Sequence, residues 1–138
     1  MKKLYFLVVF VFSFVAEAQI INFPDANFKA KLLSATPGNS SASNGVASTN
    51  FNYPGGPSFY HKIDTNNDGE IQVSEAAAIQ FLNVSNGNIS DLTGISFFTN
   101  LKTLRCGSNQ LNSLGEVLQF TNLIDLQCYS NNLTEIDL

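Results

Sequence analysis

Charged residues are scarce in this sequence, and positive charge is the scarcer kind. Charged residues make up 13% of the chain, and its formal net charge is −4. Beyond Lys2 and Lys3, the positive residues form no run; they are Lys29, Lys31, Lys62, Lys102 and Arg105. Nucleic acids and anionic membranes are bound by clusters of Lys and Arg that neutralise phosphates. The sequence therefore argues against nucleic acid and against an anionic membrane as partners.

Histidine is nearly absent as well. The one histidine, His61, follows a stretch rich in Gly and Pro and has no second His or Cys near it. A zinc site needs several such ligands, and a catalytic base needs a group to act with. We therefore expect His61 to be a surface residue. The sequence also lacks a Ser/His/Asp, Cys/His or open metal constellation, so the protein is predicted not to be an enzyme.

Only one long apolar run occurs, LYFLVVFVFSFV at residues 4–15. It is too short to span a bilayer, which takes about 20 residues. Lysines precede it and small residues follow it, which is typical of a secretory signal peptide cleaved before Gln19. We expect residues 1–18 to be removed and the protein to be secreted or displayed at the cell surface. No membrane span is expected after cleavage, and the remaining ~120 residues suffice for one domain.

Residues 19–78 are expected to form a small helical, loop-rich cap at the N-terminal end of the protein. An amphipathic helix is predicted to begin at Asp25 and to stop before Pro37. Its apolar residues Phe28, Leu32 and Leu33 fall on one face, so the helix is expected to be amphipathic.

Residues 36–60 have the composition of a long surface loop. They are rich in Ser, Asn, Gly and Pro and lack periodic apolar residues, so no helix or strand is predicted there. The aromatic residues of this stretch are Phe51, Tyr53, Phe59 and Tyr60. We expect them to pack against the body of the protein, and an aromatic sugar-binding platform is the alternative.

From residue 79 onward the sequence repeats itself with a period of 22 residues. The middle copy contains Leu101, Leu104, Cys106, Asn109, Leu111 and Leu114. The following copy answers with Leu123, Leu126, Cys128, Asn131, Leu133 and Ile136, and the less regular preceding copy with Ile79, Leu82, Val84, Gly87, Ile89 and Leu92. A fixed period in the twenties indicates stacked units. The copies span residues 79–100, 101–122 and 123–138, the last of them incomplete.

Each copy predicts one short strand and one tight return. In the middle copy Leu104 and Cys106 alternate with Arg105, as in a strand with one buried face. Asn109 follows, where an inward amide can bond the backbone of the turn. The apolar residues after it recur every three positions, the period of a 3₁₀ helix; they are Leu111, Leu114, Val117 and Phe120. Stacked coils would align parallel strands near residues 81–84, 103–106 and 125–128.

The segments LKTLRCGSNQLNSL and LIDLQCYSNNLTEI resemble leucine-rich repeats of the bacterial 22-residue type found in internalin-like proteins. The stretch from FPDANFKAKLLSA to IDTNNDGEIQVSEAAAI is similar to the N-terminal lead-in of secreted leucine-rich repeat proteins of Bacteroidetes. The resemblance implies an α/β solenoid of short parallel strands and 3₁₀-like returns. Such proteins usually carry more repeats and often a C-terminal sorting domain, so we expect this chain to be an N-terminal fragment.

Two cysteines in a secreted chain would ordinarily suggest a disulfide. Here Cys106 and Cys128 occupy the same inward position of adjacent copies, as Leu104 and Leu126 do. Neighbouring strands place such Cα atoms about 4.8 Å apart, but the side chains are poorly oriented for the torsion that a disulfide needs. We therefore expect two free thiols and expect all four side chains to be buried.

The acidic stretch DTNNDGEIQVSE at residues 64–75 resembles an EF-hand calcium loop. Its residues at loop positions 1, 3, 5, 7, 9 and 12 are Asp64, Asn66, Asp68, Glu70, Gln72 and Glu75. This spacing lets oxygen ligands close around Ca²⁺, with the backbone carbonyl at position 7 and both carboxylate oxygens at position 12. Gly69 supplies the sharp turn. The alternative is a solvated Asn-Asp-Gly turn.

The calcium loop lacks an entering helix, because YPGGPSFYHKI precedes it, whereas Ser74–Ala78 could begin a short exiting helix. A single loop of this dockerin-like sort is expected to be structural and to bind calcium weakly, at about 10⁻⁴ to 10⁻³ M. Because it precedes the first repeat, we expect it to fasten the cap over the open end of the solenoid.

Solenoids present the concave face of their sheet to partners. The candidate binding residues are outward strand positions: Phe81, Asn83, Arg105, Asp125, Gln127 and Tyr129. Arg and Tyr are enriched at binding hot spots, although an ordinary solvated face is the alternative. The sequence predicts a secreted, calcium-stabilised module that binds a protein, as in adhesion. The alternative is a carbohydrate-binding accessory module of a polysaccharide-processing system.

Overall fold

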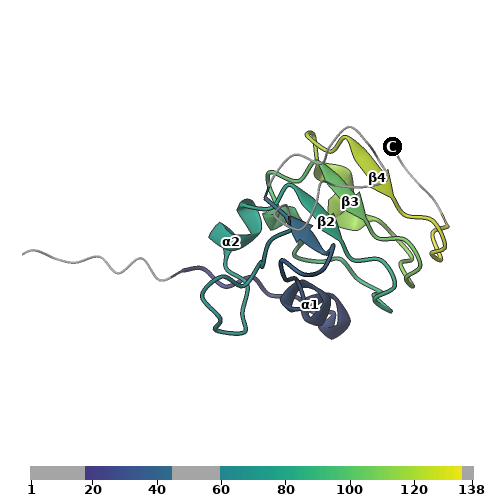
Figure 1. The fold of residues 1–138 in the computed structure, drawn as a ribbon. Coiled ribbons are helices and arrows are strands. Elements are labelled where there is room, and N and C mark those ends of the chain that lie inside the picture. Colours follow the sequence, from purple (N-terminus) through teal and green to yellow (C-terminus); the bar gives the residue numbers. More distant parts are fainter. Residues whose placement is uncertain (1–17, 45–59, 135–138) are drawn as a thin grey trace, which may run out of the picture.

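Residues 18–44 and 60–134 are described in this computed structural model, so the predicted signal peptide lies outside the described residues but for Ala18. Three parallel strands run side by side: β2 (Phe81–Asn83), β3 (Thr103–Arg105) and β4 (Asp125–Gln127) (Figure 1). Leu82, Leu104 and Leu126 stand opposite one another in adjacent strands. The strands are therefore paired in the 22-residue register that the repeat predicted.

The return paths are 3₁₀ helices, as the three-residue spacing predicted. They are η1 (Ile95–Phe97) and η2 (Gly115–Gln119), which pack against each other. Ile95 and Val117, one from each, are buried in the core. Each coil therefore has a strand on one side and a 3₁₀ turn on the other, with the apolar core between them. This is the architecture of a leucine-rich repeat.

The inward asparagine that the second and third copies share ties one coil to the next. Asn109 Oδ1 accepts from the backbone N–H of Gly87 at 2.9 Å and of Ile89 at 3.1 Å. Its Nδ2 donates to the carbonyls of Val84 and Cys106, both at 3.0 Å. Asn131, one coil later, repeats the arrangement with Leu111 N–H and the Cys106 and Cys128 carbonyls.

The core is complete in the first two coils and open in the third. Leu104 and Cys106 are fully buried, as predicted, but Leu126 and Cys128 are only half-buried. The prediction of four buried side chains was therefore wrong for the last coil, because no further coil covers it among the described residues. Both thiols are free. Burial, with a smaller contribution from Cys128, raises the pKa of Cys106 to about 12.

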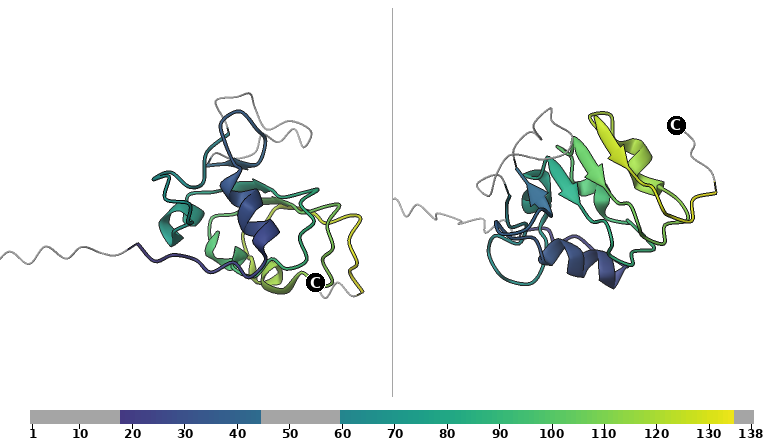
Figure 2. Two further views of the ribbon diagram at one scale, coloured as in Figure 1. Left: turned by 90° about the horizontal axis from the view of Figure 1, so that it is seen from below. Right: turned by 45° about the vertical axis from the view of Figure 1, so that its right-hand side comes forward.

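Helix α1 (Ala26–Leu33) forms as predicted, with Asp25 as its N-cap. Asp25 Oδ1 accepts from the N–H groups of Asn27 at 2.8 Å and Phe28 at 2.9 Å. Phe28 and Leu32 are fully buried. In Figure 1 and in the right-hand view of Figure 2, α1 lies along one side of the coils. Residues 34–41 connect it to the short strand that precedes β2.

Part of the predicted loop at 36–60 forms a strand, β1 (Ala42–Ser43), contrary to our expectation. It pairs antiparallel with β2, with Ala42 opposite Leu82, and both of its residues are fully buried. A strand of two residues is too short to show an alternating sequence pattern. It forms because the edge of β2 offers backbone groups for pairing. His61 is half-buried and donates its N–H to Ala42 O at 2.8 Å, so it is not a freely exposed residue.

Candidate functional site

The acidic loop leads into α2 (Val73–Ala77), the short exiting helix that the sequence predicted. Glu75 connects the two ends of the loop. Its Oε1 accepts from both the N–H and the hydroxyl of Thr65, each at 2.7 Å. Its Oε2 accepts from Gln72 N–H at 3.1 Å. Glu75 therefore has both carboxylate oxygens directed into the loop and is only 8% exposed.

Asp64 organises the first half of the loop from the inside. Its Oδ1 accepts from Asn67 N–H at 2.7 Å and its Oδ2 from Gly69 N–H at 3.3 Å. Asn67 and Gly69 both have left-handed backbones, with φ of 65° and 80°. Glycine adopts this conformation at little cost, which accounts for Gly69 at the predicted sharp turn. Asp64 is 6% exposed, so the loop encloses its carboxylate.

Asp68 lies on the exposed side of the loop among amide donors. Its Oδ1 accepts from Glu70 N–H at 2.8 Å, and its Oδ2 from Asn66 Nδ2 at 2.8 Å and Gln72 Nε2 at 2.7 Å. The backbone hydrogen bond from Glu70, followed by the side-chain bonds from Asn66 and Gln72, lowers the pKa of Asp68 despite some desolvation. The residues predicted as ligands therefore hydrogen-bond to one another.

The loop is fastened to the N-terminal segment. Lys29 of α1 donates to both carboxylate oxygens of Glu70 at 2.7 Å. Ile21 N–H bonds Ile71 O, and Val73 N–H bonds Gln19 O, both at 2.9 Å. Sequence reasoning missed the contact between Lys29 and Glu70. The only signal for it was a basic residue, Lys29, on the predicted helix.

The chemistry of the loop suits a hard cation, although its present side-chain positions do not form a closed ligand set. Asp64, Asp68 and Glu75 supply carboxylate oxygens, the ligands that Ca²⁺ prefers. Among the described residues the only salt bridge is that of Lys29 with Glu70, so these three carboxylates have no cationic side chain as partner there. Yet across residues 18–44 and 60–134 no three His, Cys, Asp or Glu side chains form a group that could hold a metal ion. Calcium binding stays a prediction.

The second candidate site is the outward side of the sheet, and Phe81 does not belong to its exposed part. We predicted Phe81 to face a partner, but it is fully buried. It stands opposite the buried Ser43 of β1, and the guanidinium of Arg105 lies over its ring, 5.3 Å from the ring centre. The antiparallel β1 could not be foreseen from the repeat, and it extends the sheet beside Phe81. Arg105 is half-buried as a result of this packing.

The other outward residues remain accessible to different degrees. Tyr129 is 60% exposed, and its ring lies over Gly107, where an added Cβ would approach Cζ to 2.8 Å. Asp125 and Gln127 are half-buried and joined by a hydrogen bond of 3.2 Å. Asn83 is also half-buried, and its Oδ1 accepts from Ser85 N–H at 3.1 Å. The accessible face is thus centred on β3 and β4.

No protein-family model matches this sequence, and no curated protein matches it. Similarity to solved structures is clear. Internalin C2 from Listeria monocytogenes superposes with a TM-score of 0.57 at 19% identity, over 88% of this chain and 43% of that one. A structure of the CBM51-2 and INT domains of Clostridium perfringens ZmpB superposes with a TM-score of 0.52 at 19% identity, over 79% of this chain and 17% of that one. These likenesses establish the leucine-rich repeat fold of internalins.

The chain spans less than half the length of the structures that it matches. Within the described residues, no helix has the length and apolar character that crossing a membrane would require. Phe51, Tyr53 and Phe59, the aromatic residues proposed as a sugar platform, lie outside the described residues.

Proposed function

We propose that this protein is a secreted binding module that presents the outward side of β3 and β4 to a protein ligand, as in adhesion. The observation that carries the proposal is Tyr129, an aromatic side chain left 60% exposed on the backbone of the neighbouring coil. Tyr and Arg are the residue types enriched at binding hot spots, and Tyr129 and Arg105 are both outward residues of adjacent coils. Parallel coils also give the extended surface that solenoids use for binding.

We further propose that calcium at residues 64–75 stabilises the cap without taking part in ligand contact. The spacing of the oxygen-bearing residues supports this, as do the two nearly buried carboxylates of Asp64 and Glu75, which already hydrogen-bond to backbone groups of the loop. In this proposal Asp64, Asn66, Asp68 and Glu75 supply side-chain oxygens, and Glu70 its backbone carbonyl. Gln72 stands at position 9, which often binds through water.

The binding role is tested with an immobilised protein that begins at Gln19. Surface proteins of candidate target cells and a glycan array are presented in parallel to the wild type and to Tyr129→Ala. Thr99→Ala, an exposed change in the turn after η1, is the matched control. We expect a defined protein to be retained by the wild type and the control, and retained at least about tenfold less by Tyr129→Ala, equivalent to a hot-spot loss of about 1.4 kcal/mol.

Binding to glycans alone, lost in the same variant, would favour the carbohydrate-accessory alternative. Retention of proteins that is equal for the wild type and Tyr129→Ala would refute the sheet face as the binding surface.

A further inference from the structure

Residues 19–23, which we call the N-terminal strap, contact two parts of the chain that are far apart in the sequence. Their side chains alternate: Ile20 and Asn22 are exposed, whereas Ile21 and Phe23 are buried. This alternation is that of a strand with one buried face. At one end the strap pairs with the acidic loop, and at the other end it packs against the first coil, residues 79–100.

The strap and the acidic loop form an antiparallel bridge. Ile21 N–H donates to Ile71 O, and Val73 N–H donates to Gln19 O, both at 2.9 Å. Ile71 is fully buried and Ile21 is 2% exposed, so apolar burial holds the bridge together with its two hydrogen bonds. The strap therefore lies against the C-terminal half of the loop as a second, very short strand.

The two peptide units of the loop that bond the strap also hold Glu75, the predicted two-oxygen calcium ligand. The unit between Ile71 and Gln72 accepts from the strap through its carbonyl, and its N–H donates to Glu75 Oε2 at 3.1 Å. The unit between Gln72 and Val73 donates to the strap, and its carbonyl accepts from the N–H groups of Glu75 at 3.1 Å and Ala76 at 3.0 Å. Because a peptide unit is planar, rotation of either one would disturb the strap and Glu75 together.

The other end of the strap is fixed to the first coil by Phe23. Its ring meets the ring of Phe28 edge-on, with 5.4 Å between the ring centres. The Phe23 ring also covers Gly94, where an added Cβ would lie 2.9 Å from two ring atoms. Gly94 has a φ of 98° and immediately precedes η1, so its backbone and the ring both favour glycine there. The strap thus runs from the acidic loop to the 3₁₀ return of the first coil.

We propose that the N-terminal strap couples calcium binding in the acidic loop to the docking of the cap on the first coil; this inference rests on the calcium binding proposed above. With the strap in place, the two peptide units keep both oxygens of Glu75 directed into the loop, and a preorganised site binds more tightly. With the strap displaced, the same units must be ordered when the cation binds, which costs conformational entropy. Since linkage is reciprocal, calcium stabilises the docked strap by the factor by which the strap strengthens calcium binding.

Val73→Pro tests the coupling, because it removes the N–H that bonds Gln19 O and changes no predicted ligand. Val73 is the first residue of α2, a position that suits proline. Gln72 before it already has the extended backbone that a following proline requires, with φ −87° and ψ 156°. Val73→Ala is the matched control, since it shortens the same side chain and keeps the N–H.

Calcium is titrated into the chain that begins at Gln19 and into both variants, and the NMR signal of Gly69 N–H in the loop reports binding. We expect Val73→Pro to raise the calcium Kd at least about tenfold, the factor that corresponds to about 1.4 kcal/mol. Val73→Ala should raise the Kd by less than about threefold, because the bond to the strap is kept.

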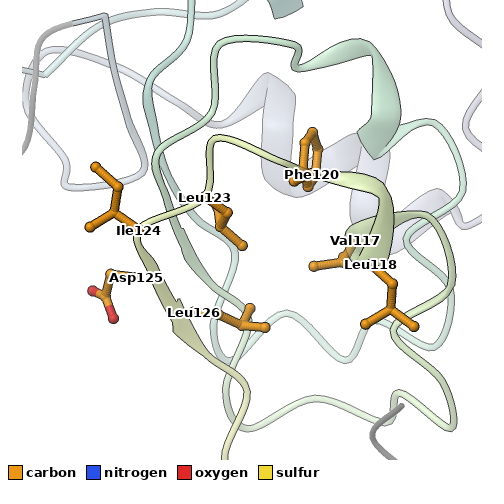
Figure 3. A pocket seen from close by; sticks show the side chains of 7 residues that line it. All are labelled: Val117, Leu118, Phe120, Leu123, Ile124, Asp125 and Leu126. Atoms are coloured by element: carbon orange, nitrogen blue, oxygen red, sulfur yellow. The ribbon is translucent and has the colours of Figure 1, made fainter. Parts of the chain in front are cut away.

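Hydrogen exchange in the wild type tests the reverse direction of the coupling. Saturating calcium should slow the exchange of Ile21 N–H by up to about tenfold, the same factor as the change in Kd. The reference amide is Val117 N–H, which bonds Leu114 O at 2.9 Å in η2. Val117 points toward Leu123 and Leu126 of the third coil (Figure 3), and its exchange rate should be the same with calcium and with chelator.

The possible outcomes distinguish the coupling from calcium binding itself. A calcium Kd that is equal in the wild type and both variants would overturn the coupling and leave calcium stabilisation standing. Equal slowing of Ile21 and Val117 would also overturn it, because calcium would then act on the whole chain. A wild type whose Gly69 signal does not respond to calcium would overturn calcium binding and the coupling with it. Circular dichroism identifies a variant that fails to fold, and wild-type exchange then decides alone.

Discussion

Asn109 does more for the solenoid than its one side chain would suggest. Its amide saturates the N–H groups of Gly87 and Ile89 and three carbonyls of the turn, those of Val84, Cys106 and Gly107. Of these five groups, the Gly107 carbonyl also accepts from the backbone N–H of Asn86 at 3.1 Å, so it keeps a partner without Asn109. A buried polar backbone group without a partner costs free energy comparable to a lost hydrogen bond.

Asn109→Ala is therefore expected to lower the free energy of unfolding by about 2–4 kcal/mol, because several buried backbone groups would lose their partner at once. Asn131→Ala is the matched comparison. It removes the equivalent bonds to three carbonyls and a bond from one N–H group instead of two, in the half-buried last coil. Water can replace these bonds there, so the variant should cost about 1 kcal/mol. Urea denaturation of the two variants measures the difference, and equal losses would contradict the role of burial.

Asp25 joins helix α1 to the first coil of the repeat. One carboxylate oxygen caps α1, and the other accepts from Ser90 N–H at 2.8 Å, Ser90 Oγ at 2.9 Å and Asp91 N–H at 3.1 Å. Burial alone would raise the pKa of this carboxyl, but the hydrogen bonds from Ser90, Phe28 and Asp91 outweigh it and lower the pKa. A helix cap thus also anchors the N-terminal segment to the first coil.

We expect Asp25→Ala to reduce stability by about 1–2 kcal/mol, the usual cost of a lost cap. Because the folded pKa lies below the unfolded one, the contribution is present above the unfolded value, near 3.8, and is lost as the pH falls through the folded value. Melting curves taken between neutral pH and pH 3 should therefore converge for the wild type and the variant. A constant gap at all pH values would show that the charge of Asp25 is irrelevant.

At the scale of the acidic loop, calcium is expected to raise the melting temperature. Binding to the folded state at ten times Kd contributes about 1.4 kcal/mol, and each kcal/mol is worth about 4–8 °C in a small domain. Glu75→Gln should abolish most of the calcium-induced shift, because it removes a charge and the two-oxygen contact. Thermal melting with calcium and with chelator measures the shift.

Glu70→Gln is the matched control for the calcium prediction. It removes the ion pair between Lys29 and Glu70, whose side chains are 30% and 37% exposed, respectively. Losing this exposed pair should lower the free energy of unfolding by about 0–1 kcal/mol, with or without metal. The difference between melting with calcium and melting with chelator should therefore survive in this variant. If chelator leaves the wild-type melting curve unchanged, the loop is an acidic turn held by its own hydrogen bonds.

Across the whole molecule, stability should decline from the cap to the last coil. Leu104 is fully buried between two coils, whereas Leu126 at the equivalent position is half-buried. Leu104→Ala is expected to cost about 3 kcal/mol and Leu126→Ala about half as much. Urea denaturation measures both losses, and equal losses would contradict the difference in burial between the two coils.

The repeat was the most predictable part of this protein. Its apolar positions are local in sequence and recur, so they define strand register, 3₁₀ returns and the inward asparagines before any coordinates exist. The helix at Asp25 was predictable for the same reason, since its cap and apolar face lie within a few residues of each other. The second role of Asp25, toward Ser90, was not, because it joins segments far apart in the sequence.

The candidate sites were predicted less completely than the fold. The sequence identified the acidic spacing from Asp64 to Glu75 but gave no sign of the Lys29 contact or of the amide bonds to Asp68. It also placed Phe81 on an exposed face, because alternation in a strand reports which side a residue occupies and not whether something covers that side.

The sequence by itself determined the class of fold, the boundaries of the coils and the acidic spacing, since all three depend on residues close together along the chain. Only the tertiary structure decided that Ala42 and Ser43 form an edge strand, that Phe81 is buried and that Leu126 and Cys128 are only half-buried. These features depend on contacts between segments that are far apart in the sequence. Such contacts form where the stacked coils leave a strand edge or apolar surface uncovered.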